Sequence, residues 1–210
     1  YYPVISHNTI YENDDCGIYY TTSQVPDIRN NTIYDNLVGI LADAEAGHIY
    51  NNTVHDNIGT GIKIVNGASP TTDNNTVYSN GEYGLEVRSS TPDVHHNHAH
   101  NNTMAGMYVE SVSGITLAKN RLVYNSGAGM FLSGSTVTLA SNRMERNRGD
   151  GLFVGSSSKF TSDKDVFANN LQSGINVSGS SPVIEGVKLT SNAYAGLRAG
   201  SSAKPLIVNS

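Results

Sequence analysis

The sequence repeats itself every 22 or 23 residues from one end to the other. A Gly precedes an apolar residue at nine positions with that spacing: Gly17, Gly39, Gly61, Gly84, Gly106, Gly129, Gly151, Gly174 and Gly196. A second landmark, which reads Asn-Thr-Ile-Tyr-Asp-Asn at 31–36, keeps the same phase. A fixed period of this length indicates stacked units, because one unit is too short to bury its own apolar face.

Each unit contains three short segments in which apolar and polar residues alternate, which is the pattern of strands. The first follows the Gly, as in Gly-Ile-Lys-Ile at 61–64, and the other two are centred on residues such as Ile28 and Ile33. Three strands per unit with little change of length predict an all-β fold, a right-handed parallel β-helix (solenoid) of about nine coils. We expect residues 1–210 to form a single parallel β-helix domain excised from a longer protein.

The recurring Gly and Asn residues have an expected structural purpose at the corners between strands. Gly adopts positive φ freely and Asn does so at modest cost. Asn side chains at the same corner of successive coils can also form hydrogen bonds to one another along the stack. We expect such an asparagine ladder at Asn13, Asn36, Asn57, Asn80, Asn102, Asn125, Asn147, Asn169 and Asn192.

The units, of the form Gly-Ile-x-x…Asn-x-x-Ile-x-x-Asn, resemble the β-helix repeats of three groups of proteins over all nine coils. These are mannuronan C5-epimerases, pectate-lyase-like enzymes and the periplasmic accessory protein of nitrous oxide reductase maturation. The resemblance implies a surface or secreted protein that acts on polysaccharides. The Asp-Pro-His motif of the epimerases and the Gly-His-Gly motif of polygalacturonases are absent from the sequence. No catalytic residue is therefore transferred from these families.

Charge is divided unevenly along the chain. Residues 1–110 carry 13 Asp and Glu against 3 Lys and Arg, a net −10, whereas residues 111–210 carry 5 against 10, a net +5. All seven His lie in the acidic half. The overall charge of −5 and the absence of a broad basic patch argue against a nucleic-acid partner. No apolar run approaches the roughly 18 residues of a membrane span.

Residues at the same phase in successive coils lie one strand spacing apart, so a function should follow columns of outward residues. The position two after each Gly holds several rings and charges, which we expect to form an exposed row that binds substrate. Aromatic rings pack on the C–H faces of sugars, although stacked rings can equally serve stability. The expected substrate-binding residues are Tyr19, Lys63, Glu86, Tyr108, Phe131 and Phe153, together with Arg143.

The sharpest candidate for catalysis combines His98, His100, Tyr78 and Arg121. His98 and His100 share one face of a strand, while Tyr78 and Arg121 lie one coil before and one coil after. A uronate lyase or epimerase needs a cation for the carboxylate, a base for the C5 proton and an acid. Arg121 with Arg143 would supply the cation, and the His and Tyr side chains the acid and the base.

Metal binding is the competing interpretation of the His-rich segment. His98 and His100 offer imidazoles, but His55 lies two coils away and His96 belongs at a corner. The loop acids Asp14-Asp15 and Asp43 with Glu45 have no calcium-loop spacing. We therefore assign no metal site and no cofactor, with Ca²⁺ as an unsupported alternative. The single Cys16 cannot form an internal disulfide.

The sequence thus predicts a secreted or cell-surface domain, with a periplasmic location as the alternative, that recognises a polysaccharide along its outer face. Uronate lyase or C5-epimerase activity is left open. The rival hypothesis is a non-catalytic structural spacer or adhesin stalk. Flanking domains or another subunit are expected to cover the coil ends, since both would expose apolar core and open strand edges.

Overall fold

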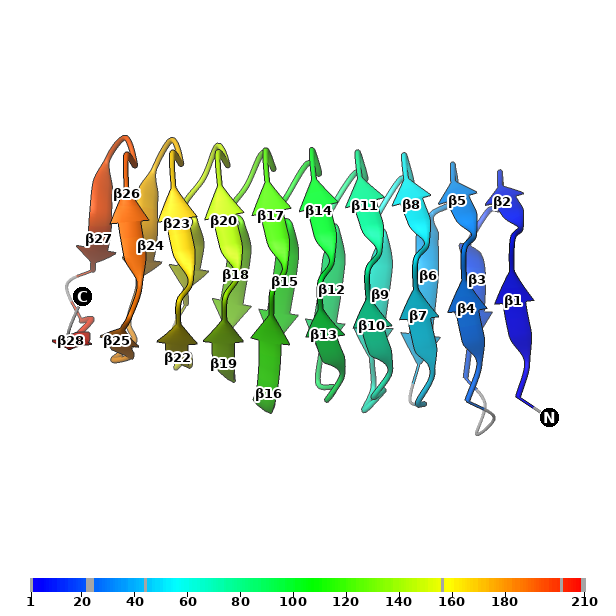
Figure 1. Ribbon diagram of the computed structural model, residues 1–210, viewed down its shortest axis with the longest axis horizontal. Coiled ribbons are helices and arrows are strands. Elements are labelled where there is room, and N and C mark those ends of the chain that lie inside the picture. Colours follow the sequence, from blue (N-terminus) through cyan, green and yellow to red (C-terminus); the bar gives the residue numbers. More distant parts are fainter. Residues whose placement is uncertain (1, 22–24, 44, 156, 201, 209–210) are drawn as a thin grey trace.

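The computed structural model describes residues 2–21, 25–43, 45–155, 157–200 and 202–208. The chain winds into a straight rod whose strands lie across its long axis (Figure 1). Every strand pairs in parallel with its counterpart one coil away, never with its neighbour in sequence. The predicted parallel β-helix is confirmed. None of the described residues belongs to a helix long and apolar enough to cross a membrane.

Three long sheets form the sides of the rod. Sheet A contains β1 (Val4–Ser6), β4 (Asp27–Arg29), β7 (His48–Tyr50), β10 (Thr71–Asp73), β13 (Asp93–His95), β16 (Ser113–Ala118), β19 (Thr136–Ala140) and β22 (Lys159–Asp163). Sheet B contains β2 (Thr9–Tyr11), β5 (Thr32–Tyr34), β8 (Thr53–His55), β11 (Thr76–Tyr78), β14 (His98–His100), β17 (Arg121–Val123), β20 (Arg143–Glu145), β23 (Val166–Ala168) and β26 (Lys188–Thr190).

Sheet C contains β3 (Cys16–Tyr20), β6 (Val38–Asp43), β9 (Ile62–Val65), β12 (Leu85–Arg88), β15 (Met107–Glu110), β18 (Met130–Ser133), β21 (Leu152–Val154), β24 (Ser173–Val177) and β27 (Ala195–Ala199). In the last coils β25 (Val183–Glu185) pairs with β28 (Leu206–Val208) as a separate two-stranded sheet.

The core fills the inside of the rod because each strand turns alternate side chains inward. In sheet B the middle residue of a strand is the buried one, as at Ile33, Val77 and Leu122. Its two neighbours therefore face outward, and every coil contributes two outward residues to this face. The three-residue strands are too short to be stable alone, so stacking holds them.

Two buried asparagine ladders run along the two edges of sheet B. In each ladder an Asn amide donates to the Oδ1 of the Asn one coil later, as from Asn80 to Asn102 at 3.0 Å. The first ladder is the predicted one, except that Asn170 and not Asn169 continues it from Asn147. The second ladder was not predicted and contains Asn8, Asn31, Asn52, Asn75, Asn97, Asn120, Asn142 and finally Asp165.

The reason proposed from sequence for the Gly and Asn residues is wrong in detail. Positive φ belongs to the residue before each ladder position, such as Asn101 before Asn102, and the ladder residues are not themselves in that region. The nine repeating Gly residues also have no positive φ. They are needed for close approach, because a Cβ on Gly106 would lie 2.9 Å from the carbonyl oxygen of Gly129.

The predicted register of the outward columns holds through β20 and then slips by one residue. Phe167 follows Glu145 by 22 residues and so has the phase of an outward residue, but it pairs with Met144 and is fully buried. Ala168 continues the outward column from Glu145 instead. The slip follows from burial, since the core accepts the ring of Phe167 and leaves the smaller Val166 and Ala168 at the flanks.

Candidate functional site

A column of stacked rings covers the first five strands of sheet B. The rings of Tyr11, Tyr34, His55, Tyr78 and His100 lie 4.8 to 5.1 Å apart and within 9° of parallel. This separation is the spacing of neighbouring strands, so the backbone pairing sets the stack. Each ring face inside the column is covered by the next ring. The column therefore offers solvent its ring edges and hydroxyl groups rather than the open faces expected for sugar stacking.

His98, His100 and Arg121 meet at the end of this column. The His98 and His100 rings are 4.5 Å apart, and His100 stacks on Tyr78. An Arg121 Nη1 atom lies 2.7 Å from His98 Nε2. Because guanidinium can only donate, Nε2 of His98 is the acceptor and its proton is on Nδ1. The structure thus brings together all four residues of the predicted catalytic cluster.

Both imidazoles in this cluster are held in the neutral form. Burial first, and then the charges of His100 and Arg121, lower the pKa of His98 to about 4. Burial and Arg121 also lower the pKa of His100 from its ordinary value. A neutral imidazole can accept a proton, but the acceptor nitrogen of His98 already binds Arg121. His100 is consequently the better candidate for a base.

The two Arg side chains proposed to neutralise a carboxylate differ in their surroundings. Arg143 donates to both carboxylate oxygens of Glu145, at 2.7 and 3.2 Å. Arg121 lies one strand earlier in the same column, paired with His98 and Arg143. Within the described part of the chain, Arg121 forms no ion pair with a carboxylate. Its charge is therefore free for a ligand, whereas that of Arg143 is neutralised internally.

The row predicted on sheet C exists in register, but its members are not uniformly exposed. Tyr19 is 54% exposed, whereas Glu86 is 1% exposed. Glu86 accepts a hydrogen bond from Thr60 at 3.0 Å, lies 3.6 Å from the ammonium of Lys63 and pairs with Arg88. Two of the predicted substrate contacts, Lys63 and Glu86, are thus engaged with each other. The expectation that Glu86 is an exposed residue is wrong.

The rings of the sheet C row also stack on one another. Tyr108 lies between Tyr83 at 4.7 Å and Phe131 at 5.4 Å, and Phe131 lies 4.6 Å from Phe153. Arg88 also lies over the Tyr108 ring, with its guanidinium carbon 4.9 Å from the ring centre. These half-buried rings shield the backbone ladder, in agreement with the stabilising interpretation considered from sequence.

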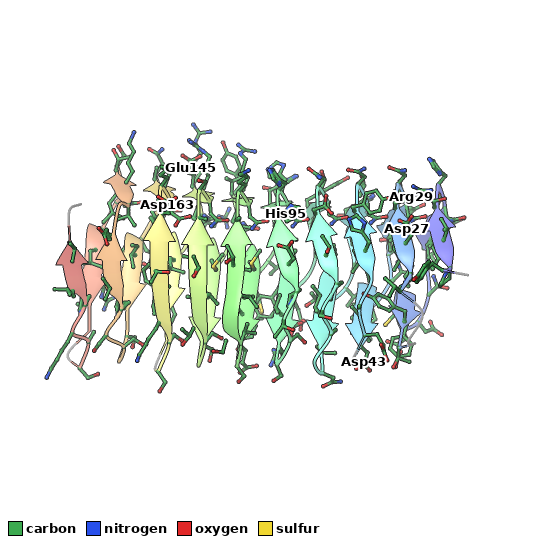
Figure 2. The ribbon with its side chains drawn as sticks, turned by 60° about the horizontal axis from the view of Figure 1, so that its bottom comes forward. Asp27, Arg29, Asp43, His95, Glu145 and Asp163 are labelled. Atoms are coloured by element: carbon green, nitrogen blue, oxygen red, sulfur yellow. The ribbon has the colours of Figure 1, made fainter. Side chains whose placement is uncertain are left out.

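Sequence reasoning missed a polar cluster on sheet A. His48 Nε2 lies 2.7 Å from Asp73 Oδ1, and the His48 ring stacks on Tyr50 at 4.0 Å. Arg29 donates to the Tyr50 hydroxyl at 2.9 Å and lies 3.7 Å from Asp27. Figure 2 shows Asp27, Arg29 and His95 along one edge of the rod, with Asp43 on the opposite edge. The strand register was the available signal, because it places Arg29, Tyr50 and Asp73 in one column.

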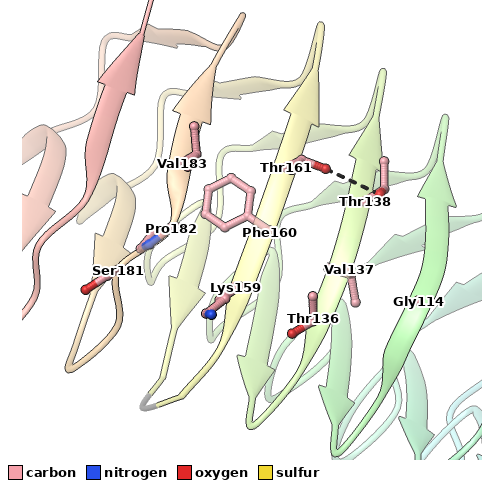
Figure 3. Close-up of a pocket in the computed structure, with 10 residues that line it drawn as sticks. All are labelled: Gly114, Thr136, Val137, Thr138, Lys159, Phe160, Thr161, Ser181, Pro182 and Val183. Carbon is pink, nitrogen blue, oxygen red and sulfur yellow. Dashed lines mark hydrogen bonds between the residues drawn. The ribbon is translucent and has the colours of Figure 1, made fainter.

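Two hollows lie on the outer side of sheet A. One, of about 590 Å³, is lined by Tyr2, Val4, Val25, Pro26, Asp27 and His48. The other, of about 390 Å³, lies where sheet A stops at β22 and β25 begins a separate sheet (Figure 3). Its polar side chains are Thr136, Thr138, Lys159, Thr161 and Ser181. Neither hollow includes a residue of the predicted catalytic cluster.

Metal coordination has no support from the geometry. In the described part of the chain, no three His, Cys, Asp or Glu side chains converge to hold a metal ion. His95 and His96 do approach each other, with their Nδ1 atoms 2.9 Å apart. Burial, followed by the hydrogen bond that the thiol donates to Asp15, raises the pKa of Cys16 to about 11, so the thiol stays protonated at neutral pH.

Solved structures with the same architecture include enzymes that act on polysaccharides. A double mutant of the periplasmic alginate epimerase AlgG superimposes with a TM-score of 0.79 at 22% identity, covering 87% of this chain and 49% of that one. The A-module of the Azotobacter vinelandii mannuronan C-5 epimerase AlgE4 superimposes with a TM-score of 0.73 at 18% identity, covering 89% of this chain and 58% of that one. Pectate lyase Pel9A superimposes with a TM-score of 0.72 at 14% identity, covering 97% of this chain and 70% of that one. The chain thus spans about half the length of the AlgG structure.

No curated protein matches the sequence significantly. A family model described as the right handed beta helix region matches residues 1–72 and 38–183, which together cover most of the chain. The match agrees with the three long parallel sheets and with the structural neighbours. The chain belongs to the right-handed β-helix family.

Proposed function

We propose that the outer face of sheet B binds an anionic polysaccharide, with uronate polymers as the preferred class. The proposal rests on the surroundings of Arg121, an exposed cation that forms no ion pair within the described part of the chain. Arg121 lies against two neutral imidazoles, at the end of the column of stacked rings. Its charge can neutralise a sugar carboxylate, while hydroxyl groups of the polymer meet the imidazoles and the Tyr hydroxyl. The epimerase and lyase neighbours support this ligand class.

The cluster also has the parts needed for lyase or epimerase chemistry. Arg121 would lower the pKa of the C5 proton by pairing with the uronate carboxylate. Neutral His100 would accept that proton, and the Tyr78 hydroxyl would donate one to the leaving oxygen or to the opposite face of C5. His98 would act by orienting Arg121 through their 2.7 Å contact. In a lyase, the C5 electron pair expels the C4 oxygen and leaves a C4–C5 double bond.

Contacts outside the cluster extend the proposed ligand surface. Arg143 continues the Arg121 column by one strand, and on sheet C the exposed Tyr19 ring and the half-buried Tyr108, Phe131 and Phe153 rings form a second candidate surface. For a protein that handles such polymers we propose a secreted, cell-surface or periplasmic location. The AlgG structures, described as periplasmic, support that location.

The test is binding of the purified chain to neutral and acidic polysaccharides at low and raised salt, with ultraviolet absorbance followed for unsaturated products. Arg121→Gln should remove most binding to a uronate polymer. Lys159→Gln, which removes an exposed cation on sheet A, is the control and should leave binding intact. Rising absorbance identifies a lyase, and binding without it leaves a binding module or an epimerase. Equal binding by the two variants would contradict the assigned site.

A structural rod without a ligand is the second candidate. The stacking of ring faces on sheets B and C favours it, because the rings already satisfy one another. The ion network of Lys63, Glu86, Arg88 and Glu110 favours it too, since these charges are neutralised within the chain. Failure to bind any polysaccharide at low salt would select this candidate.

A further inference from the structure

Charge on sheet B and its two flanking corners changes sign along the rod. Over β2–β14 and their corners the charged residues are all acidic and all exposed: Glu12, Asp14, Asp15, Asp35, Asp56 and Glu82. The three cations of residues 1–110, namely Arg29, Lys63 and Arg88, lie on sheets A and C and are each engaged by a carboxylate. Among the described residues, this part of the sheet B face is therefore acidic with no cation.

The later strands carry the opposite sign. Their outward and corner positions hold Lys119, Arg121, Arg143, Arg146, Lys164 and Lys188, all exposed. Glu145 neutralises Arg143, and Lys164 lies 3.8 Å from Asp163 in a pair that is exposed and thus weak. Arg146 donates to the Tyr124 hydroxyl at 2.6 Å and covers its ring. The face from β17 to β26 is consequently basic, and His98 and His100 stand at the boundary.

The acidic column is close enough to affect a ligand. At the usual strand spacing, β8 with Asp56 lies about 10 Å from β14 along the rod. That distance is about one screening length at 0.1 M salt, and the screening length grows as salt is lowered, so at low salt Asp56, and more weakly Asp35 and Glu12, repel a polyanion that extends past β14. Glu12, Asp35 and Asp56 occupy one corner of consecutive coils, where φ is positive in each. Their charges therefore add along one line beside the ring column.

We propose that a polyanion binds only the half of this face from β14 to β26, and that the His98–His100–Arg121 cluster receives the end of the bound stretch. This inference rests on the proposed function and adds a direction and a length to it. Four strand steps give a footprint of about 19 Å. A longer polymer leaves the rod at β14 rather than following it to β2.

The experiment measures dissociation constants for a series of uronate oligomers of increasing length at low salt. The variant Glu12→Asn, Asp35→Asn, Asp56→Asn removes the acidic column. Asn is the residue that the same corner carries at Asn101 and Asn169, where φ is also positive, so the backbone conformation should be kept. The control variant Asp43→Asn, Glu45→Gln, Asp93→Asn removes three acidic charges outside the sheet B face. Circular dichroism and thermal unfolding establish that each variant folds.

For the unaltered protein, affinity should rise with length until the oligomer covers about 19 Å and then level off. The corner variant should bind oligomers beyond that length roughly fivefold more tightly and shorter ones unchanged. The control should match the unaltered protein. Equal length dependence in all three proteins would overturn this inference while leaving the proposed function in place. Binding of no oligomer by any of them would overturn the proposed function itself.

Discussion

Truncating one ladder side chain tests how the coils are held together. Asn102 donates its amide to the Val77 carbonyl at 3.3 Å and to Asn125 Oδ1 at 3.0 Å. Its own Oδ1 accepts the backbone N–H of Asn80 at 3.1 Å and the Asn80 amide at 3.0 Å. Asn102 is fully buried, so water cannot replace these partners. Asn102→Ala removes all four bonds from the middle of the rod.

The expected loss of stability follows from counting these bonds. The Asn80 N–H loses the side-chain acceptor that it uses, which costs about 1–3 kcal/mol for a buried donor. The other three bonds are worth about 1 kcal/mol each in net terms. We therefore expect a loss of roughly 4–6 kcal/mol of unfolding free energy. An exposed neighbour, changed in Thr103→Ala, is the control and should cost less than about 0.5 kcal/mol.

Urea unfolding of the two variants measures the difference, and hydrogen exchange shows where it arises. The amide of Asn80 should exchange much faster in Asn102→Ala, while amides in β23 should change little, because a solenoid couples mainly nearest neighbours. If Asn102→Ala unfolds at the same urea concentration as Thr103→Ala, the ladder is not what stabilises the stack.

Three further predictions concern single positions. Burial raises the pKa of Asp165, so above about pH 3.8 the folded chain binds more protons than the unfolded one, and stability falls as pH rises from there. Asp165→Asn should therefore be more stable than the unaltered protein at pH 7. The difference in unfolding temperature should vanish in acid, which thermal unfolding across a pH series measures. In an NMR titration the His98 ring should have its midpoint near pH 4. Arg121→Gln should move this midpoint only part of the way back to the ordinary value, because burial is the larger cause of the low pKa. A midpoint at 6.5 in the unaltered protein would show that the ring is solvated. Tyr78→Phe should keep the stack and the unfolding temperature, whereas Tyr78→Ala loses contacts to two rings and about 1–3 kcal/mol of stability; an unfolding temperature equal in both variants would contradict a stabilising stack.

The repeat alone was enough to predict the fold, because each coil repeats the same alternation and the strand pairing follows from it. Register could be predicted wherever one residue fitted the inward position. At 169–170 two consecutive Asn residues fit equally well, and the choice depends on which neighbour, Phe167 or Val166, fills the core. That choice is made by packing volume, which spacing does not encode.

The sequence predicted which residues the candidate site contains, but not their side-chain conformations, ion pairs or burial. Strand phase placed His98, His100, Tyr78 and Arg121 together, and the structure agrees. Side-chain conformation then determines which groups are available to a ligand. The rings of the column stack face to face, Arg143 pairs with Glu145, and Arg88 pairs with Glu86. Such choices depend on neighbours in three dimensions, so outward phase did not reveal that Glu86 is buried.

The proposed recognition face is best tested by mapping where a uronate oligomer binds, using backbone amide chemical shifts of the isotopically labelled protein. Shifts on titration should concentrate on the sheet B strands from β14 to β26, be largest around Arg121, and disappear in Arg121→Gln. Shifts concentrated on sheet A, near its two hollows, or the absence of any shift at low salt would contradict the claim that sheet B is the recognition face.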